Sequence, residues 1–389
     1  MSARPPLPLL LLTVASFGCL YVPQPLLPEL AAVFGVHAAE ASLLITATML
    51  PLALAPLFYG YVLEGVPALR MVTVAGLLLA AAQLGMALSQ DWGVLLALRI
   101  VAGLSLPALF TALVTQVSRT AARAQVRQAV AWYIAATIFG GFLGRALSGV
   151  LAEFLDWRAV FGFWAGAMLL ALWRVARLGI PGESHFGRLR LQVFREVLGT
   201  PGFAAAYAAI FGIFFVFAGF LNVLPFRLQA LSDRLGPGAI GLAYGGYLVG
   251  LAVTLGNARI RAWVGRESRL LAAGTALYAL GLASFLVPAP AAIYLGMYSF
   301  CGGMFLLHGR LSGQVNQRAA DHQGVVNGLY IASYYLGGAI GSWVAPAAYR
   351  LLGWQALLAV LGGVLALAAV GLARMSTALE APPGAEDEA

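Results

Sequence analysis

Long runs of apolar residues, separated by short polar segments, recur along the whole chain. Each run approaches the roughly 20 residues that a helix needs to cross the hydrocarbon core of a membrane. Twelve runs are distinct enough to be drawn as spans: 7–30, 41–63, 68–89, 93–115, 128–152, 159–178, 203–225, 239–257, 269–287, 291–313, 325–347 and 355–374. The pattern therefore predicts an all-α integral membrane protein with twelve transmembrane helices.

A segment of six spans occurs twice in the chain. The glycine motif that begins at Gly140, and Trp157 beyond it, return at Gly337 and Trp354, 197 residues further on. The same offset relates Tyr133 to Tyr330 and Leu27-Pro28 to Leu224-Pro225. Two parallel repeats of six spans are typical of a transporter made of two helix bundles with a site between them. We expect four regions: an N-terminal six-helix bundle (1–178), a cytoplasmic linker (179–200), a C-terminal six-helix bundle (201–375) and a disordered cytoplasmic tail (376–389).

Composition supports the membrane interpretation and excludes several kinds of chemistry. The chain is 61% hydrophobic and only 10% charged, and all 23 basic residues are arginine. Without lysine there is no Walker-type phosphate loop and no Schiff-base chemistry. Cys19 and Cys301 both fall in apolar runs and suggest no disulfide. Hydrolase motifs and a metal-ligand spacing are also missing, so we expect no enzyme activity, no cofactor and no metal.

The arginines also predict the orientation of the chain in the membrane. With the N-terminus placed in the cytoplasm, sixteen arginines fall on the inner side and four on the outer side, and Arg99, Arg145 and Arg310 lie within spans. The positive-inside rule therefore places both termini in the cytoplasm. Because the arginines are spread over many short loops, their expected partners are membrane lipids rather than nucleic acid. We expect a monomer in the inner membrane of a bacterial-type cell.

Several motifs resemble those of the major facilitator superfamily, in particular its acriflavine-sensitivity (YnfM-like) branch. They extend along most of the chain: Leu20-Tyr21-x-x-Gln24-Pro25-x-Leu27-Pro28, Arg99-x-x-x-Gly103-x-x-x-Pro107-Ala108, Gly140-Gly141-x-x-Gly144-Arg145-x-x-Ser148-Gly149, Asp156-Trp157-Arg158, Leu224-Pro225-Phe226-Arg227-Leu228, His308 and Tyr334-Tyr335-x-Gly337. The resemblance implies alternating access by two rocking bundles and proton-coupled export of a small organic compound.

One loop departs from the family pattern. Between spans two and three the superfamily usually reads Gly-x-x-x-Asp-Arg-x-Gly-Arg-Arg, and this loop normally latches the outward-open state by charge pairing. Here the loop begins at Gly60, its acid is Glu64, and most of the basic partners are gone. Glu64 is therefore a candidate gating residue, but we do not expect the latch to operate in its usual form.

Three ionisable residues inside spans are candidates for function because burying such groups in a membrane is costly. At a rise of 1.5 Å per residue, Arg99 and Arg145 lie about 9 and 10 Å below the outer ends of spans four and five. His308 lies about 25 Å from the outer end of span ten. Arg145 suits an anionic substrate group or an outer gate with Glu29; alternatively it pairs with Glu153 or with backbone carbonyls.

The other two ionisable residues are candidates for proton coupling. Arg99 resembles the span-four arginine that the family links to proton transfer, and its alternative is a structural hydrogen-bond hub. No carboxylate lies deep in any span, so His308, whose imidazole titrates near neutral pH, is the best candidate for the coupling proton. Its alternative is a neutral histidine bonded to a neighbouring helix.

Aromatic and amide side chains complete the candidate site. In the facilitator fold, spans one, four, seven and ten line the path, and an amide that faced lipid would lack partners. The resulting candidates for substrate binding, with Arg145, are Tyr21, Gln24, Asn222, Tyr298 and Tyr334. An arginine-containing cavity without a deep acid favours an anionic, zwitterionic or neutral solute over a cationic drug.

The sequence leaves several functions open. The preferred function is proton-coupled export of a small organic solute, with the solute, protons and membrane lipids as partners. Import by proton symport, export of cationic drugs and lipid flipping are alternatives on the same fold. An integral membrane enzyme would require a cluster of catalytic residues at one membrane face, and the sequence has none.

Overall fold

The computed structural model describes residues 5–62, 66–178, 191–200, 202–318 and 323–380 of the chain. The apolar runs form α-helices because a helix satisfies its backbone polar groups internally where no water is available. Apart from two short 3-10 turns, the helices are α1 (Leu7–Tyr21), α2 (Leu27–Phe34), α3 (Ala38–Ala41), α4 (Leu43–Val62), α5 (Ala68–Leu88), α6 (Trp92–Thr120), α7 (Val126–Phe154), α8 (Trp157–Ala176), α9 (Leu191–Gly199), α10 (Phe203–Leu231), α11 (Pro237–Ala243), α12 (Gly246–Val264), α13 (Glu267–Ser284), α14 (Pro290–Arg318) and α15 (Gln323–Glu380).

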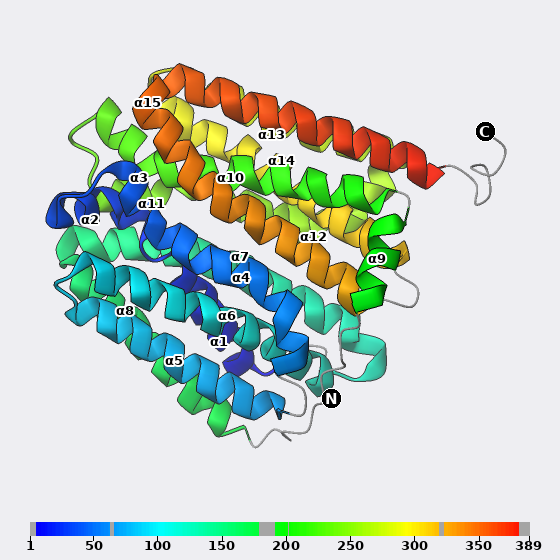
Figure 1. The fold of residues 1–389 in the computed structure, drawn as a ribbon, viewed down its shortest axis with the longest axis horizontal. Helices are drawn as coiled ribbons and strands as arrows, with labels where there is room; N and C mark the ends of the chain where they lie inside the picture. The colour runs from blue at the N-terminus through cyan, green and yellow to red at the C-terminus, as the bar shows by residue number, and fades with distance from the viewer. Residues whose placement is uncertain (1–4, 63–65, 179–190, 201, 319–322, 381–389) are drawn as a thin grey trace.

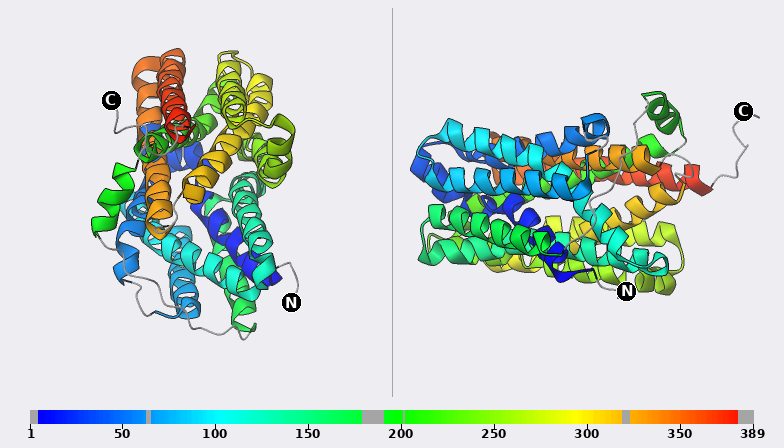
Figure 2. Two further views of the ribbon diagram at one scale, coloured as in Figure 1. Left: turned by 90° about the vertical axis from the view of Figure 1, so that its right-hand side faces the viewer. Right: turned by 90° about the horizontal axis from the view of Figure 1, so that it is seen from below.

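The helices form two groups with parallel long axes (Figures 1 and 2). We call α1 to α8 the N-half and α10 to α15 the C-half. The start of α1 and the end of α15 lie at the same end of the molecule (Figure 1), and we call the opposite end, which carries α2, α3 and α11, the distal end. The linker contributes one helix, α9, which packs on α10 and α15.

The helices can be matched to the twelve predicted spans once two features are recognised. Within the described part of the chain, ten helical segments are long and apolar enough to cross a membrane. The last of these, within α15, contains two spans joined at Gly353, whose φ of 82° lies in the left-handed region that favours glycine. The remaining predicted span, 269–287, corresponds to α13, which packs against α14. The final helix continues to Glu380, into the region expected to be a disordered tail; residues 381–389 lie outside the described part.

The internal repeat of the sequence is also a repeat of packing. In the N-half, α7 lies on α1 so closely that a Cβ on Gly140 would be 2.6 Å from the Val14 carbonyl oxygen. In the C-half, a Cβ on Gly337 would be 2.2 Å from the Phe211 carbonyl oxygen. Val14 and Phe211 are themselves 197 residues apart, so the same helix contact is built twice. Small residues permit this close approach of helix backbones in membranes.

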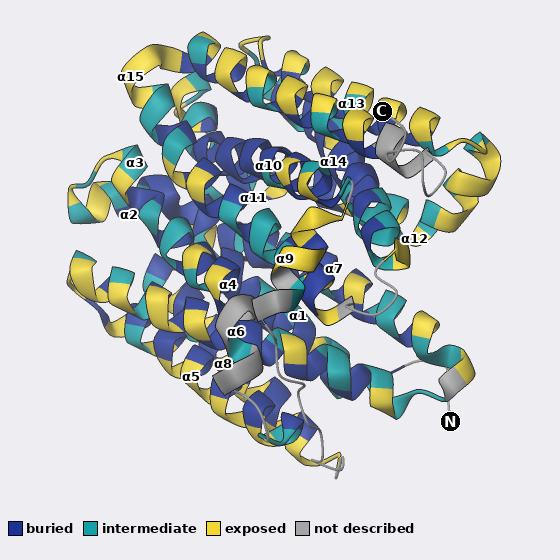
Figure 3. Ribbon diagram, turned by 45° about the vertical axis from the view of Figure 1, so that its right-hand side comes forward, coloured by how far each residue is buried: buried dark blue, intermediate teal, exposed yellow. Residues whose placement is uncertain are grey.

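Burial separates an interior from a lipid-facing surface. Buried residues concentrate along the middle of the molecule, where the halves meet, and exposed residues lie on its outer helices (Figure 3). Many of the exposed residues are large and apolar, among them Leu77 and Leu78 on α5 and Leu169 and Leu170 on α8. Large exposed apolar surface is unfavourable in water and is expected where lipid tails surround the protein.

The halves are tied together towards the distal end. There Thr46 of α4 bonds to the Ala339 carbonyl of α15 at 3.3 Å. The Gly238 amide donates to Glu153 at 2.9 Å, joining α11 to α7. A Cβ on Gly149 would be only 2.3 Å from the Pro237 carbonyl oxygen. Every hydrogen bond between two described residues of opposite halves belongs to this part of the interface, so the molecule is closed at its distal end.

Candidate solute-binding site between the two halves

Arg145 lies in α7 at the interface between the halves, and only 1% of its side-chain surface is exposed. Its Nε donates to Oε1 of Gln24, and its Nη1 donates to the Gly141 carbonyl at 2.6 Å. Among the described residues, no carboxylate lies within 4.0 Å of the guanidinium. Arg145 therefore carries a buried charge whose nearby partners are neutral.

Gln24 connects this arginine to the other half. Its Nε2 donates to Oδ1 of Asn222 at 2.5 Å, and Nδ2 of Asn222 donates to the Ser342 carbonyl at 3.2 Å. All three residues are fully buried. The result is a polar chain from α7 through the first span to α10 and α15. The sequence prediction that both amides face the interior agrees with this geometry.

Local structure explains why Gln24 can reach both partners. The first span is broken into α1, a 3-10 turn over Gln24–Leu26 and α2. Pro23, Pro25 and Pro28 cause this break because proline has no amide hydrogen and clashes with the preceding helical turn. A mid-span 3-10 segment often marks a hinge.

Aromatic rings surround the guanidinium. Its central carbon lies 3.6 Å from the ring centroid of Tyr21 and 4.5 Å from that of Tyr247. Tyr244 follows at 5.3 Å. Cation–π contacts partly offset the cost of burying a charge, but they supply no negative charge. Tyr247 and Tyr244 were not predicted from the sequence, because their place in an apolar run does not reveal which way they face.

A second cluster lies on the C-half and contains two of the predicted residues. Tyr334 stacks on Phe214 with a centroid distance of 3.6 Å, and the His308 ring lies 4.9 Å from that of Tyr334. The hydroxyl of Tyr330 lies 3.1 Å from Nδ1 of His308 and donates to the His308 carbonyl at 3.1 Å. His308 thus has both a polar partner and an aromatic neighbour.

Arg99 has a different environment from Arg145. Its Nε donates to the Leu44 carbonyl at 2.7 Å, and its Nη1 and Nη2 donate to the carbonyls of Cys19 and Leu20 at 3.0 and 2.6 Å. These bonds tie α6 to α1 and α4 within one half. The geometry matches the structural hub that the sequence allowed as an alternative for Arg99.

Three other predicted residues do not join this network. Tyr298 is 47% exposed and shares an outer face of α14 with Leu295, which is more exposed still. Glu29 lies on α2 at the distal end and forms no ion pair with Arg145. Glu64 lies outside the described residues. An apolar sequence does not specify how α14 is rotated about its own axis. This rotation explains why Tyr298 faces outwards.

Two carboxylates have partners that sequence reasoning missed. Glu153 bonds to Gly238 of the opposite half, as described above, and not to Arg145. Glu267 pairs with Arg310, whose Nε lies 2.5 Å from Oε1, and Nη1 of Arg310 donates to Asn257 at 3.2 Å. This second group joins α12, α13 and α14 within the C-half. Arg310 falls inside the tenth apolar run, 291–313, and this position was the only sequence signal for the group.

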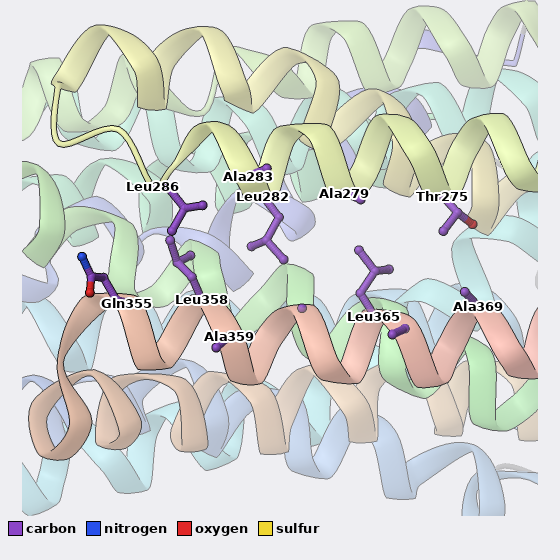
Figure 4. Close-up of a pocket in the computed structure, with 12 residues that line it drawn as sticks. Thr275, Ala279, Leu282, Ala283, Leu286, Gln355, Leu358, Ala359, Leu365 and Ala369 are labelled. Atoms are coloured by element: carbon purple, nitrogen blue, oxygen red, sulfur yellow. The ribbon is translucent and has the colours of Figure 1, made fainter.

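A groove of about 450 Å³ lies between α13 and the last span of α15 (Figure 4). Of the twelve residues that line it, only Thr275 and Gln355 have polar side chains. The groove is on the periphery of the C-half and is separate from the polar network between the halves. It is therefore not part of the candidate site.

Comparison with known proteins supports the same class. The family model of the Major Facilitator Superfamily matches residues 9–341. The chain is 27% identical over 377 residues to the inner membrane transport protein YnfM of Escherichia coli (strain K12), covering 95% of this chain and 89% of the relative. It is 24% identical over 333 residues to the MFS-type transporter YybF of Bacillus subtilis (strain 168), covering 84% and 81%. A crystal structure of the peptide transporter POT in complex with sulfate has the same fold, with a TM-score of 0.76, 14% identity and coverage of 96% and 95%.

The two bundles, their repeated packing and the polar contact between them define a transporter of the two-bundle type. The chain belongs to the major facilitator superfamily. It is thus a multi-pass membrane protein, and the predicted resemblance and the all-α fold are confirmed.

Proposed function

We propose that the protein exports a small organic solute by alternating access, in exchange for protons. The solute is anionic, zwitterionic or neutral. The observation that carries this proposal is Arg145, a buried positive charge placed between the halves with only neutral partners. A buried ionisable group in a membrane is costly and marks a functional site by default.

Each candidate residue has a role in this proposal. The solute contacts Arg145 together with Tyr21, Gln24, Asn222 and Tyr334. His308 carries the coupling proton, with Tyr330 as its hydrogen-bond partner. Arg99 positions the first, second and fourth spans for that step, because a guanidinium does not release its proton in proteins. Glu29 and Glu64 take part in gating.

We also propose a location and orientation. The protein is a monomer in the inner membrane with both termini in the cytoplasm, as the distribution of arginines indicates. The distal end then faces outwards, and the described conformation is closed on the outside. The relative YnfM, which is named as an inner membrane transport protein, is consistent with this location.

The test is transport by the full-length protein in sealed proteoliposomes with an imposed pH gradient. The panel holds organic anions, zwitterions, sugars and cationic dyes, chosen after a thermal-unfolding screen in detergent. A ligand at 100 times its dissociation constant stabilises a protein by about 2.7 kcal/mol. We expect gradient-driven movement of an anion, zwitterion or sugar, and loss of that movement in Arg145→Gln.

Other outcomes would replace the proposal. Movement of the solute together with protons would make the protein a symporter. Movement of cationic dyes alone, unaffected by Arg145→Gln, would make it an ordinary drug exporter. Scrambling of labelled lipids without movement of any solute would identify a flippase.

A further inference from the structure

Arg145 needs a negative charge that the described part of the chain does not provide. Its guanidinium is buried among Tyr21, Tyr247 and Gln24, all of which are neutral. Nε and Nη1 are each used in one hydrogen bond, whereas Nη2 donates to no described residue. Leaving a buried charge without a counter-charge is strongly unfavourable. An anionic group on the solute would supply that charge.

Both the oxygen and the nitrogen of the Gln24 amide are engaged in hydrogen bonds. Its oxygen accepts from Arg145 in the N-half, and its nitrogen donates to Asn222 in the C-half at 2.5 Å. Because the amide is planar, the bond to Arg145 orients the nitrogen towards Asn222. Losing the first bond therefore weakens the second, which is one of the few hydrogen bonds that join the halves.

An anion at Arg145 would compete directly with Gln24. The bond from the guanidinium to the neutral amide oxygen is already charge-assisted, but a carboxylate also supplies the counter-charge that the buried guanidinium lacks. The solute anion would displace the neutral amide oxygen and leave Gln24 without the partner that orients it. The proline-broken segment around Gln24 has no continuous helix to hold the side chain in place.

We propose that Gln24 is a clasp between the halves, and that a carboxylate or other oxyanion of the solute opens it by displacing Gln24 from Arg145. This inference rests on the proposed transport function and deepens it by naming the class of the solute and the contact that its binding breaks. The clasp links occupation of the site to opening of the distal end.

The experiment measures exposure of the distal interface in purified full-length protein. Ala339 is 1% exposed and its carbonyl accepts from Thr46 of the opposite half, so Ala339→Cys reports separation of the halves through its rate of maleimide labelling. The native thiols of Cys19 and Cys301 are buried. The probes are acetate, benzoate and sulfate, with benzamide as the neutral counterpart of benzoate and choline as a cation.

In the Ala339→Cys parent, we expect at least one of the anion probes, but neither benzamide nor choline, to accelerate labelling. Gln24→Ala and Asn222→Ala should each accelerate labelling without any probe, by at least about threefold, from the loss of one interhelical hydrogen bond. In Gln24→Ala the active anion should still raise the unfolding temperature but should no longer change the labelling rate.

The matched control is Gln83→Ala. Gln83 is also a fully buried glutamine, but its amide donates to the Cys19 carbonyl at 3.0 Å within the N-half. We expect this variant to lose stability while labelling at the parent's rate and responding to the anion as the parent does. Thermal unfolding of every variant identifies any that fail to fold.

Three results would overturn the clasp. They are an anion response in Gln24→Ala equal to that of the parent, unchanged basal labelling in both Gln24→Ala and Asn222→Ala, and no response of the parent to any of the anion probes. Each can occur in a protein that still transports a solute in proteoliposomes. Conversely, a clasp that behaves as expected in a protein that moves no solute would refute the transport function alone.

Discussion

Arg99 and Arg145 are both buried arginines in the N-half, and their partners distinguish their roles. Arg99 has three backbone carbonyls as acceptors, all from its own half. Arg145 reaches the interface between the halves and contacts the side chain that crosses it. In the sequence, the two residues are of the same type and lie at nearly the same depth. Sequence reasoning therefore identified both, but it could not decide for either one between a functional and a structural role.

The same limit applies to the other candidate residues. Gln24 and Asn222 were chosen because a buried amide needs partners, and both are buried; their role in solute binding stays a prediction. Tyr298 lies on an exposed face, because a tyrosine hydroxyl can find partners in many environments. Tyr247 belongs with Arg145 but gave no signal, since only three-dimensional packing decides which aromatic residues face a charge.

His308 gives a prediction at the residue scale. His308 is proposed to carry the coupling proton, so the transport rate should vary with pH as its imidazole titrates. We expect His308→Ala and His308→Gln to abolish gradient-driven exchange in proteoliposomes and to flatten this pH profile, although the glutamine retains a polar partner for Tyr330.

The control for that prediction is His37→Ala, since His37 lies exposed at the start of α3. This variant should keep both the exchange rate and the pH profile. A parent-like pH profile in both His308 variants would show that His308 does not carry the coupling proton.

At the scale of elements, the offset of 197 residues proved to be more informative than any single motif. It predicted two six-span bundles, and it also relates the packing partners to each other: Gly144 lies on Gly18 as Gly341 lies on Phe215. The same offset relates Arg145 to Ser342, whose carbonyl accepts a hydrogen bond from Asn222. The short 3-10 turn at Gln24 and the helical extension to Glu380 were not predicted, because their boundaries depend on local geometry rather than on apolar periodicity.

The repeated glycine contacts give a prediction for helix packing. A Cβ on Gly144 would lie 2.5 Å from the Gly18 carbonyl oxygen, and one on Gly341 would lie 2.2 Å from that of Phe215. Because both obstacles are backbone atoms, Gly144→Ala and Gly341→Ala should each destabilise the fold by about 1–3 kcal/mol, as overpacked cores do. Thermal unfolding in detergent measures the effect.

Gly362 provides the matched control, since a Cβ there has nothing within 4 Å. It lies in the last span of α15, beyond the junction at Gly353, and alanine is intrinsically better than glycine in a helix by up to about 1 kcal/mol. Gly362→Ala should therefore be neutral or slightly stabilising. If Gly144→Ala and Gly341→Ala were equally harmless, close helix contact would not be the reason for these glycines.

At the scale of the whole molecule, the polar network and the distal contacts describe one conformation. The halves meet where Gln24 bonds to Asn222 and where Glu153 bonds to Gly238. Alternating access requires that these contacts break in a second conformation in which the distal end is open. The sequence predicted the two bundles and a site between them but not which end is closed, because both states use the same helices.

Gly149 allows the equilibrium between these conformations to be tested directly. It lies on α7 against α11, where a Cβ would be 2.3 Å from the Pro237 carbonyl oxygen and 2.9 Å from the Cα atom of Gly241. Gly149→Leu cannot be accommodated by moving a side chain, so it penalises the distal-closed state by about 1–3 kcal/mol. Since 1.4 kcal/mol corresponds to a factor of ten, the ratio of open to closed molecules should rise by roughly 5- to 150-fold.

Spin labels on Leu155→Cys and Asp233→Cys, one on each half beside the distal interface, report this shift as a distribution of distances. We expect a longer-distance population to grow in Gly149→Leu. Gly162→Leu, whose Cβ meets nothing within 4 Å on α8, should leave the parent's distribution unchanged. An unchanged distribution in Gly149→Leu would show that the close α7–α11 contact does not hold the distal end closed.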